Sequence, residues 1–186
     1  MVKVYYSVKK IVHDLPFDEN LFPQAVVEHI KRYKDEGAYE QSAQAWTLLA
    51  KVIEKSFGKD IKKLKINFSK RGKPYCRKFN FSISHIDGFV AVSVSKKPCG
   101  IDIEKIVQRK NMGQISKVVL GGTALDEMGL FYENWTTAEA VSKMFDIPVC
   151  DVKDLKENSY QKTHIKKKEY VVCIVSTKKF DIVKIS

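Results

Sequence analysis

The chain has 186 residues, of which 44% are hydrophobic and 30% charged, and its formal net charge is +11. These proportions exclude a disordered or fibrous chain, and the length predicts one compact unit or two small lobes. The longest fully apolar run, Tyr170 to Val175, is too short to cross a bilayer, and the first residues lack the apolar core of a signal peptide. We therefore expect a cytoplasmic protein with no membrane partner. The four cysteines form no CxxC pair, so we expect reduced thiols.

In the first half of the chain, apolar spacing predicts a strand, two helices and a hairpin. Residues 2–7 are β-branched and aromatic, as is typical of a strand. Apolar residues recur at helical spacing from Phe22 to Tyr33, and again from about Glu40 to Phe57, where Gly58 ends the second helix. Further strands are expected at 65–68, 79–84 and 89–95. The last two form a hairpin.

The second half repeats part of this pattern. A strand begins at Ile101, a loop with room for one short helix spans 107–130, and a helix spans Trp135–Phe145. From Tyr160 the tail is rich in strands, and its THI…YVVCIVSTKK echoes the earlier SHI…FVAVSVSKK. This echo suggests two similar lobes, residues 1–98 and 99–186. Because helices precede strands rather than alternate with them, we expect an α+β fold and not a doubly wound parallel sheet.

The segment Gly100–Glu104, GIDIE, places two carboxylates on one face of a predicted strand. Residues two apart on a strand face the same way, so Asp102 and Glu104 project together while Ile101 and Ile103 point into the core. Like charges on one face repel each other unless a cation lies between them, and hard ions such as Mg²⁺ take carboxylate oxygens. The alternative is a pair of solvated charges on an edge strand.

A third carboxylate lies on the later predicted helix. Trp135, Glu139 and Lys143 stand four residues apart, on one side of that helix. In the functional interpretation, Glu139 completes a metal site and Lys143 reaches a phosphate. In the alternative, Glu139 and Lys143 form an ordinary i,i+4 ion pair and Trp135 anchors the core.

Two further motifs suit phosphate binding. In SISH, His85 stands at the predicted hairpin tip beside the hydroxyl of Ser84, and the two can donate hydrogen bonds to a phosphate. In RGKPY, Gly72 permits close approach of the backbone, Lys73 supplies a point charge and Pro74 stiffens the turn. The spacing of a P-loop is missing. A solvent-exposed turn histidine is the alternative interpretation of His85.

In their order along the chain, GKP, SISH, GIDIE and W-x3-E-x3-K resemble the 4'-phosphopantetheinyl transferases. The similarity is to the larger monomeric branch, which activates carrier proteins of nonribosomal peptide and polyketide synthases. It is close from Arg71 to Lys143 and loose from Lys31 to Phe57, and the hairpin followed by GIDIE is its most specific part. The resemblance implies a monomer with two similar α/β lobes related by pseudo-twofold symmetry and an active site in the cleft between them.

The resemblance also implies that coenzyme A binds in that cleft as co-substrate. Its adenine would border Lys73 and Pro74. Its 3'-phosphate would be held by Ser84 and His85, together with the basic cluster Lys31 and Arg32.

By the same resemblance, Asp102, Glu104 and Glu139 would bind Mg²⁺, with Mn²⁺ as the alternative, and the ion would grip the pyrophosphate. Lys143 would contact the phosphate under attack. A serine of an acyl or peptidyl carrier protein would attack the β-phosphorus, and 3',5'-ADP would leave. Glu139 would take the serine proton directly or through a water. Such carrier proteins are acidic, which suits the charge of +11.

Two positions depart from the family pattern. The family usually has a lysine just before the helix glutamate, where this chain has Ala138, and an early-helix arginine that aligns loosely with Gln41. A catalytically impaired relative that binds coenzyme A or a carrier protein is therefore the alternative. A basic nucleic-acid-binding module is disfavoured, because the aromatic residues fall largely on core stripes and not on a basic sheet face. We expect no nucleic-acid partner.

Overall fold

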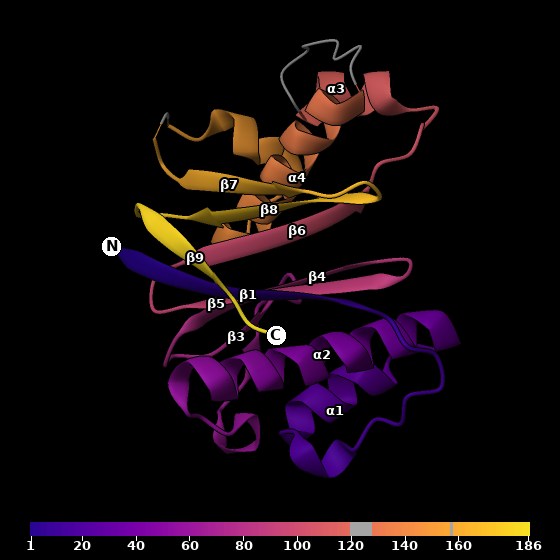
Figure 1. Cartoon of the computed structure of the whole chain (residues 1–186), viewed down its shortest axis with the longest axis vertical. Coiled ribbons are helices and arrows are strands. Elements are labelled where there is room, and N and C mark those ends of the chain that lie inside the picture. Colours follow the sequence, from indigo (N-terminus) through magenta and orange to yellow (C-terminus); the bar gives the residue numbers. More distant parts are fainter. Residues whose placement is uncertain (120–127, 157) are drawn as a thin grey trace.

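The computed structural model describes residues 1–119, 128–156 and 158–186. Their elements stack in four layers (Figure 1). Helices α1 (Gln24–Lys31) and α2 (Glu36–Phe57) form the first layer, followed by a four-stranded sheet, a three-stranded sheet and helix α4 (Met128–Phe145). This is a mixed α+β fold, so the predicted fold class is confirmed at that level.

The four-stranded sheet combines strands from both ends of the chain. Its order is β4-β5-β1-β9. Its strands are β1 (Val2–Lys10), β4 (Asn80–Ile86), β5 (Phe89–Ser95) and β9 (Phe180–Lys184). β1 and β4 each pair antiparallel with β5, whereas β9 runs parallel to β1. The last strand therefore lies beside the first, as Figure 1 shows.

The three-stranded sheet is fully antiparallel, with the order β6-β8-β7. Its strands are β6 (Cys99–Lys105), β7 (Gln161–Lys166) and β8 (Tyr170–Ser176). Each sheet thus contains an opening strand, β1 or β6, paired with the second strand of a later hairpin. In both halves a long helix, α2 or α4, lies between the opening strand and that hairpin in the sequence.

Short elements complete the described chain. They are η1 (Glu19–Leu21), η2 (Ile61–Lys63), β2 (Asn67–Phe68), β3 (Pro74–Tyr75), α3 (Met112–Val119) and η3 (Val149–Asp154). β2 and β3 form a separate two-stranded sheet. The loop expected at 107–130 contains α3 and the start of α4, while its residues 120–127 lie outside the described residues.

Helix α2 begins and ends where its side chains satisfy the backbone. The Asp35 carboxylate accepts a hydrogen bond from the Ala38 amide at 2.8 Å, and Gly58 takes a left-handed conformation with φ of 60°. The helix therefore starts four residues before the predicted Glu40 and ends as predicted. Its apolar stripe, including Trp46 and Leu49, packs on the four-stranded sheet.

A second core lies between the two sheets. Ile101 and Ile103 of β6 are buried there with Val4 of β1 and Val172 of β8. The alternation predicted for GIDIE is confirmed, because these isoleucines point into the core. Asp102 between them is directed to a different set of partners, on β4 and α4.

Helix α4 touches β6 at a glycine. A Cβ atom added to Gly100 would overlap the backbone carbonyl oxygen of Ala140 and crowd Val175. Only a residue without a side chain lets the helix backbone approach the strand this closely. The contact sets the height of α4 above β6, and so positions Glu139 and Lys143 over Asp102.

All four cysteines fall within the described residues and are free, as expected. Burial raises the pKa of the Cys99 thiol to about 12, which keeps it protonated and unreactive. In the part of the chain that the structure describes, no helix has both the length and the apolar composition needed to cross a membrane.

We predict that Gly100→Ala lowers the free energy of unfolding by about 2–3 kcal/mol, because the added methyl group must push α4 off β6. Urea denaturation measures this change. Gly113→Ala in α3 is the matched control, since a Cβ there meets nothing within 4 Å. That control should change stability by less than about 1 kcal/mol, in the stabilising direction. Equal effects of the two substitutions would contradict the close contact.

Candidate active site

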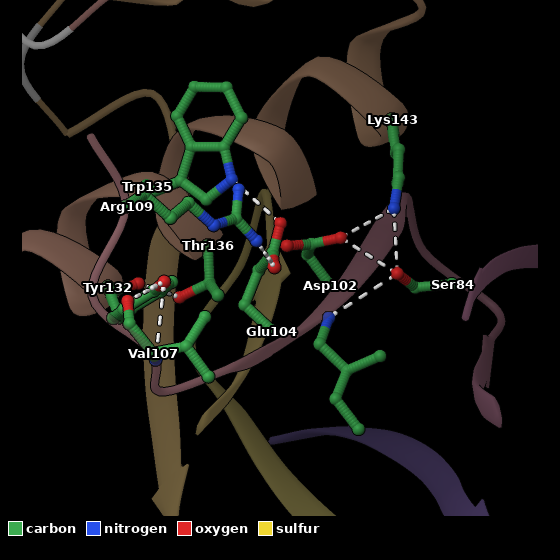
Figure 2. Close-up of polar contacts among 10 residues, drawn as sticks. Ser84, Asp102, Glu104, Val107, Arg109, Tyr132, Trp135, Thr136 and Lys143 are labelled. Atoms are coloured by element: carbon green, nitrogen blue, oxygen red, sulfur yellow. Dashed lines mark hydrogen bonds and ion pairs between the residues drawn. The ribbon is translucent and has the colours of Figure 1, made fainter. Parts of the chain in front are cut away.

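The candidate site lies where edge strands of the two sheets meet beneath α4. The Ser84 hydroxyl on β4 donates to Asp102 Oδ1 on β6 at 2.8 Å, and accepts from the Ile103 amide at 3.3 Å. Lys143 Nζ on α4 lies 2.6 Å from the same Asp102 oxygen and 2.9 Å from the Ser84 hydroxyl. Figure 2 shows Lys143 and Ser84 converging on Asp102. Three layers therefore contribute one side chain each to this network.

Asp102 is 3% exposed, which contradicts the alternative in which it is a solvated charge on an edge strand. Its Oδ1 atom carries both contacts described above, while its buried Oδ2 atom has no hydrogen-bond partner among the described residues. A buried carboxylate oxygen without a partner carries a desolvation penalty, and such an oxygen is a free ligand position for a cation.

Glu104 projects from the same face of β6 two residues later and is held by two donors. Trp135 Nε1 on α4 donates to its Oε1 at 2.9 Å, and Arg109 Nη2 lies 2.6 Å from its Oε2 (Figure 2). Burial raises the pKa of the Glu104 carboxyl and the negative charge of Asp102 raises it further, while these two donors lower it. Trp135 thus binds Glu104 as well as packing beside the core of α4.

Arg109 is a site residue that the sequence analysis did not identify. Its guanidinium lies over the Tyr132 ring, 5.5 Å from the ring centroid. The Tyr132 hydroxyl donates to the Val107 carbonyl at 2.6 Å. Arg109 lies in a segment without clear periodicity, so no local pattern pointed to it; only its five-residue separation from Glu104 could have suggested the pair.

Glu139 lies on α4, four residues before Lys143, and is partly buried. Burial raises the pKa of its carboxyl, and the charges of Asp102 and Glu104 raise it further, whereas Lys143 lowers it. The three carboxylates are therefore close enough to act on one another. Lys143 pairs with Asp102 and not with Glu139, so the predicted alternative of a simple i,i+4 ion pair is wrong.

The chemistry of this cluster fits a divalent cation. Three carboxylates offer hard oxygen ligands, one buried oxygen lacks a partner, and their mutual repulsion would be relieved by a positive ion. In the described conformation, two of the three are instead paired with Lys143 and Arg109. Among the described residues, no three histidine, cysteine, aspartate or glutamate side chains form a group that could hold a metal ion.

A cavity of about 270 Å³ adjoins this cluster and shares Lys143 with it. The described residues that line it come from the RGKPY turn, β4 and the end of α4: Arg71, Gly72, Lys73, Pro74, Phe81, Ser82, Ile83, Ser142, Lys143, Asp146 and Ile147. Ser82 is 5% exposed, and its hydroxyl finds no hydrogen-bond partner among the described residues. A polar ligand in the cavity could satisfy it.

Lys73 and His85 have environments that favour their neutral forms. Lys73 Nζ donates to the Met144 carbonyl at 2.9 Å, and burial lowers the pKa of its ammonium group while Asp146 opposes that change. His85 is exposed at the surface, yet partial desolvation by neighbouring protein atoms lowers its imidazole pKa, and the charge of Lys143 lowers it further. An anionic ligand beside either group would favour the charged form.

His85 lies within β4 and not at the hairpin tip, which corrects the predicted strand end at residue 84. The backbone pairs His85 with Val90 and Ile86 with Phe89. Asp87 and Gly88 alone form the turn, where Gly88 has φ of 85°. Ser84 and His85 therefore project from opposite faces of β4, Ser84 toward Asp102.

The basic cluster on α1 is not brought to the cavity. Lys31 Nζ lies 2.7 Å from Glu19, and Arg32 contacts the His29 imidazole at 3.1 Å and lies over the Phe68 ring. Neither residue is among the described residues that line the cavity. Their contact with a phosphate stays a prediction.

Comparison of the sequence with protein-family models finds no match. Comparison with curated proteins finds none either.

We predict that Lys143→Met lowers the free energy of unfolding by about 2–4 kcal/mol, because it leaves the Asp102 carboxylate buried without its cation. In the double variant Asp102→Asn/Lys143→Met, the loss should be smaller than the sum of the two single losses. Urea denaturation of all three variants at pH 7 measures this coupling.

Lys105→Met is the matched control. Lys105 and Asp87 are also 2.6 Å apart, but their side chains are 36% and 90% exposed, against 31% and 5% for Lys143 and Asp102. Loss of this exposed pair should cost less than about 1 kcal/mol. Additive effects of the Asp102 and Lys143 substitutions would show that the two side chains are not coupled.

Proposed function

We propose that the chain is a Mg²⁺-dependent 4'-phosphopantetheinyl transferase, which moves the phosphopantetheine arm of coenzyme A to a serine of an acyl or peptidyl carrier protein. The proposal is supported by two observations: the charge of Asp102 raises the pKa of both Glu104 and Glu139, and a cavity lined by Lys143 and Lys73 adjoins these carboxylates. These five residues come from the GKP, GIDIE and W-x3-E-x3-K motifs on which the family resemblance rests.

The connectivity of the two sheets supports two similar lobes. Each contains an opening strand, a long helix and a hairpin whose second strand pairs with the opening strand. The proposed lobes, 1–98 and 99–186, meet at the short connection between β5 and β6, while β9 returns to the sheet of the first lobe. The candidate site lies between β4 of one lobe and β6 of the other, where a cleft between lobes would be.

Coenzyme A would occupy the cavity, with its adenine against Lys73 and Pro74. His85, in its charged form, would hold the 3'-phosphate, whereas Ser84 projects from the other face of β4 and donates to Asp102. The free hydroxyl of Ser82 would add a hydrogen bond to the bound cofactor. The charge of +11 would attract both this polyanion and an acidic carrier protein.

In the proposed reaction, the carrier serine oxygen forms a bond to the β-phosphorus as the bond from that phosphorus to the bridging oxygen breaks. The phosphopantetheine arm remains on the serine, and 3',5'-ADP leaves with the bridging oxygen. Asp102, Glu104 and Glu139 would hold the Mg²⁺, which when bound supplies charge neutralisation at the pyrophosphate. Lys143 would add its charge at the phosphate under attack.

Glu139 is suited to take the serine proton, directly or through a water. Burial and the neighbouring carboxylates raise the pKa of its carboxyl, whereas Lys143 lowers it and a bound Mg²⁺ would lower it further, so its place beside the metal makes it the candidate base. Glu104 is less suited, because both of its oxygens already accept hydrogen bonds.

A catalytically impaired relative is the second candidate, and two observations favour it. Arg109 occupies Glu104 Oε2, and Ala138 supplies no lysine on α4 just before Glu139. Such a protein would bind coenzyme A or a carrier protein without efficient transfer.

We expect an apo carrier protein incubated with this chain, coenzyme A and Mg²⁺ to gain the mass of one phosphopantetheine arm on its serine. Asp102→Ala and Glu139→Gln should each slow this transfer by about 100-fold or more, since each removes a carboxylate from the reacting centre. Glu133→Gln is the control, because Glu133 lies on the same helix but pairs with Lys166. If no carrier among several gains mass while coenzyme A still binds, the impaired relative is favoured.

His85→Ala should weaken binding of coenzyme A by about tenfold, the effect of losing one charge-assisted hydrogen bond. Binding of dephospho-coenzyme A, which lacks the 3'-phosphate, should change little. Isothermal titration calorimetry with both ligands measures the difference. An equal loss for the two cofactors would mean that His85 does not contact the 3'-phosphate.

A further inference from the structure

Glu104 is the only one of the three clustered carboxylates with donors on both oxygens. Trp135 Nε1 holds Oε1 at 2.9 Å and Arg109 Nη2 holds Oε2 at 2.6 Å. The Glu104 side chain is 15% exposed, so water has little access to replace either donor. A carboxylate that binds a metal ion must offer at least one oxygen to it. Glu104 Oε2, the oxygen that Trp135 does not contact, is already paired with the Arg109 guanidinium.

Arg109 is fixed in this position by more than its ion pair. Its guanidinium stacks over the Tyr132 ring at 5.5 Å, and such a contact stabilises a cation. Tyr132 is itself fully buried, and its hydroxyl binds the carbonyl of Val107, two residues before Arg109. The segment that leaves β6 thus contacts Tyr132 of α4 at two places, Val107 and Arg109, which are both drawn in Figure 2.

We propose that Arg109 is a built-in competitor of the divalent ion for Glu104, so that metal binding and the Arg109–Glu104 pair oppose each other. The inference rests on the proposed function and adds a control on the metal affinity of the same site. Two cations on one carboxylate oxygen repel each other, and the metal must therefore displace a paired arginine before it gains the full set of ligands. Arg109 keeps Glu104 neutralised when no metal is bound, at the expense of a lower metal affinity.

The test is direct binding of Mn²⁺, followed by its electron paramagnetic resonance signal, with no substrate present. Arg109→Gln should raise the affinity for Mn²⁺ by about tenfold, the change expected when one charge-assisted contact no longer has to be broken. Arg109→Lys keeps a positive charge and should fall between the wild type and Arg109→Gln.

Lys105→Gln is the matched control. It removes the same charge from the end of β6, but Lys105 pairs with Asp87 and not with Glu104. Its affinity for Mn²⁺ should stay within about twofold of the wild type, because exposed charges are screened. An equal rise in Lys105→Gln and Arg109→Gln would overturn the inference, since it would reflect net charge alone.

The variant Glu104→Gln distinguishes two claims: that the site binds a metal ion, and that Arg109 competes with that ion. If Glu104→Gln weakens Mn²⁺ binding and Arg109→Gln leaves it unchanged, the site exists but Arg109 does not compete for it, and this inference is wrong. If Mn²⁺ binds to none of the proteins, the inference falls together with the metal site. The mass gain of a carrier protein then decides separately whether transfer itself occurs.

Discussion

The ion pair between Asp102 and Lys143 is the interaction on which the candidate site depends. β4 and β6 belong to different sheets and share no backbone ladder, so side chains must join them. Ser84, Asp102 and Lys143 do so through one carboxylate oxygen. The buried Asp102 carboxylate is stabilised by Lys143. Lys143 reaches it only because α4 lies close to β6, and this close approach requires a residue without a side chain at position 100. The packing of α4 on Gly100 and the pairing of Lys143 with Asp102 thus both hold α4 in place over β6.

The site contains three carboxylates, but only two of them are paired with a cation. Lys143 and Arg109 each neutralise one of three clustered carboxylates, and Asp102 still keeps one buried oxygen without a partner. The pKa of the third carboxyl, that of Glu139, is raised by burial and by the charges of Asp102 and Glu104 and is lowered by Lys143. Such an arrangement would attract a further cation. The proposed transfer of a phosphoryl group would use preorganised charge of this kind.

Much of this could be predicted from local patterns, because a strand or helix imposes its period on the residues within it. The alternation of Ile101, Asp102 and Ile103 predicted correctly which side chains enter the core. The helix stop at Gly58 was equally clear, since its left-handed backbone favours glycine. The predicted start of α4 at Trp135 is wrong: residues 128–134 already belong to the helix, and Phe131 and Tyr132 among them are buried by tertiary contacts.

Contacts between distant segments could not be predicted in this way. Nothing in the spacing of Arg109 indicates that it pairs with Glu104, or that Lys143 prefers Asp102 to Glu139. These choices depend on the height and rotation of α4 above β6, which only the packed structure defines. The parallel pairing of β9 with β1 is of the same kind, since it joins Val2 to Phe180 across nearly the whole chain.

That pairing gives the chain an unusual order of assembly during synthesis. The four-stranded sheet gains its outer strand only after residues 180–184 have emerged from the ribosome, when Ile185 can bind Tyr6. Until then one edge of β1 has unpaired backbone groups, to which another strand could bind.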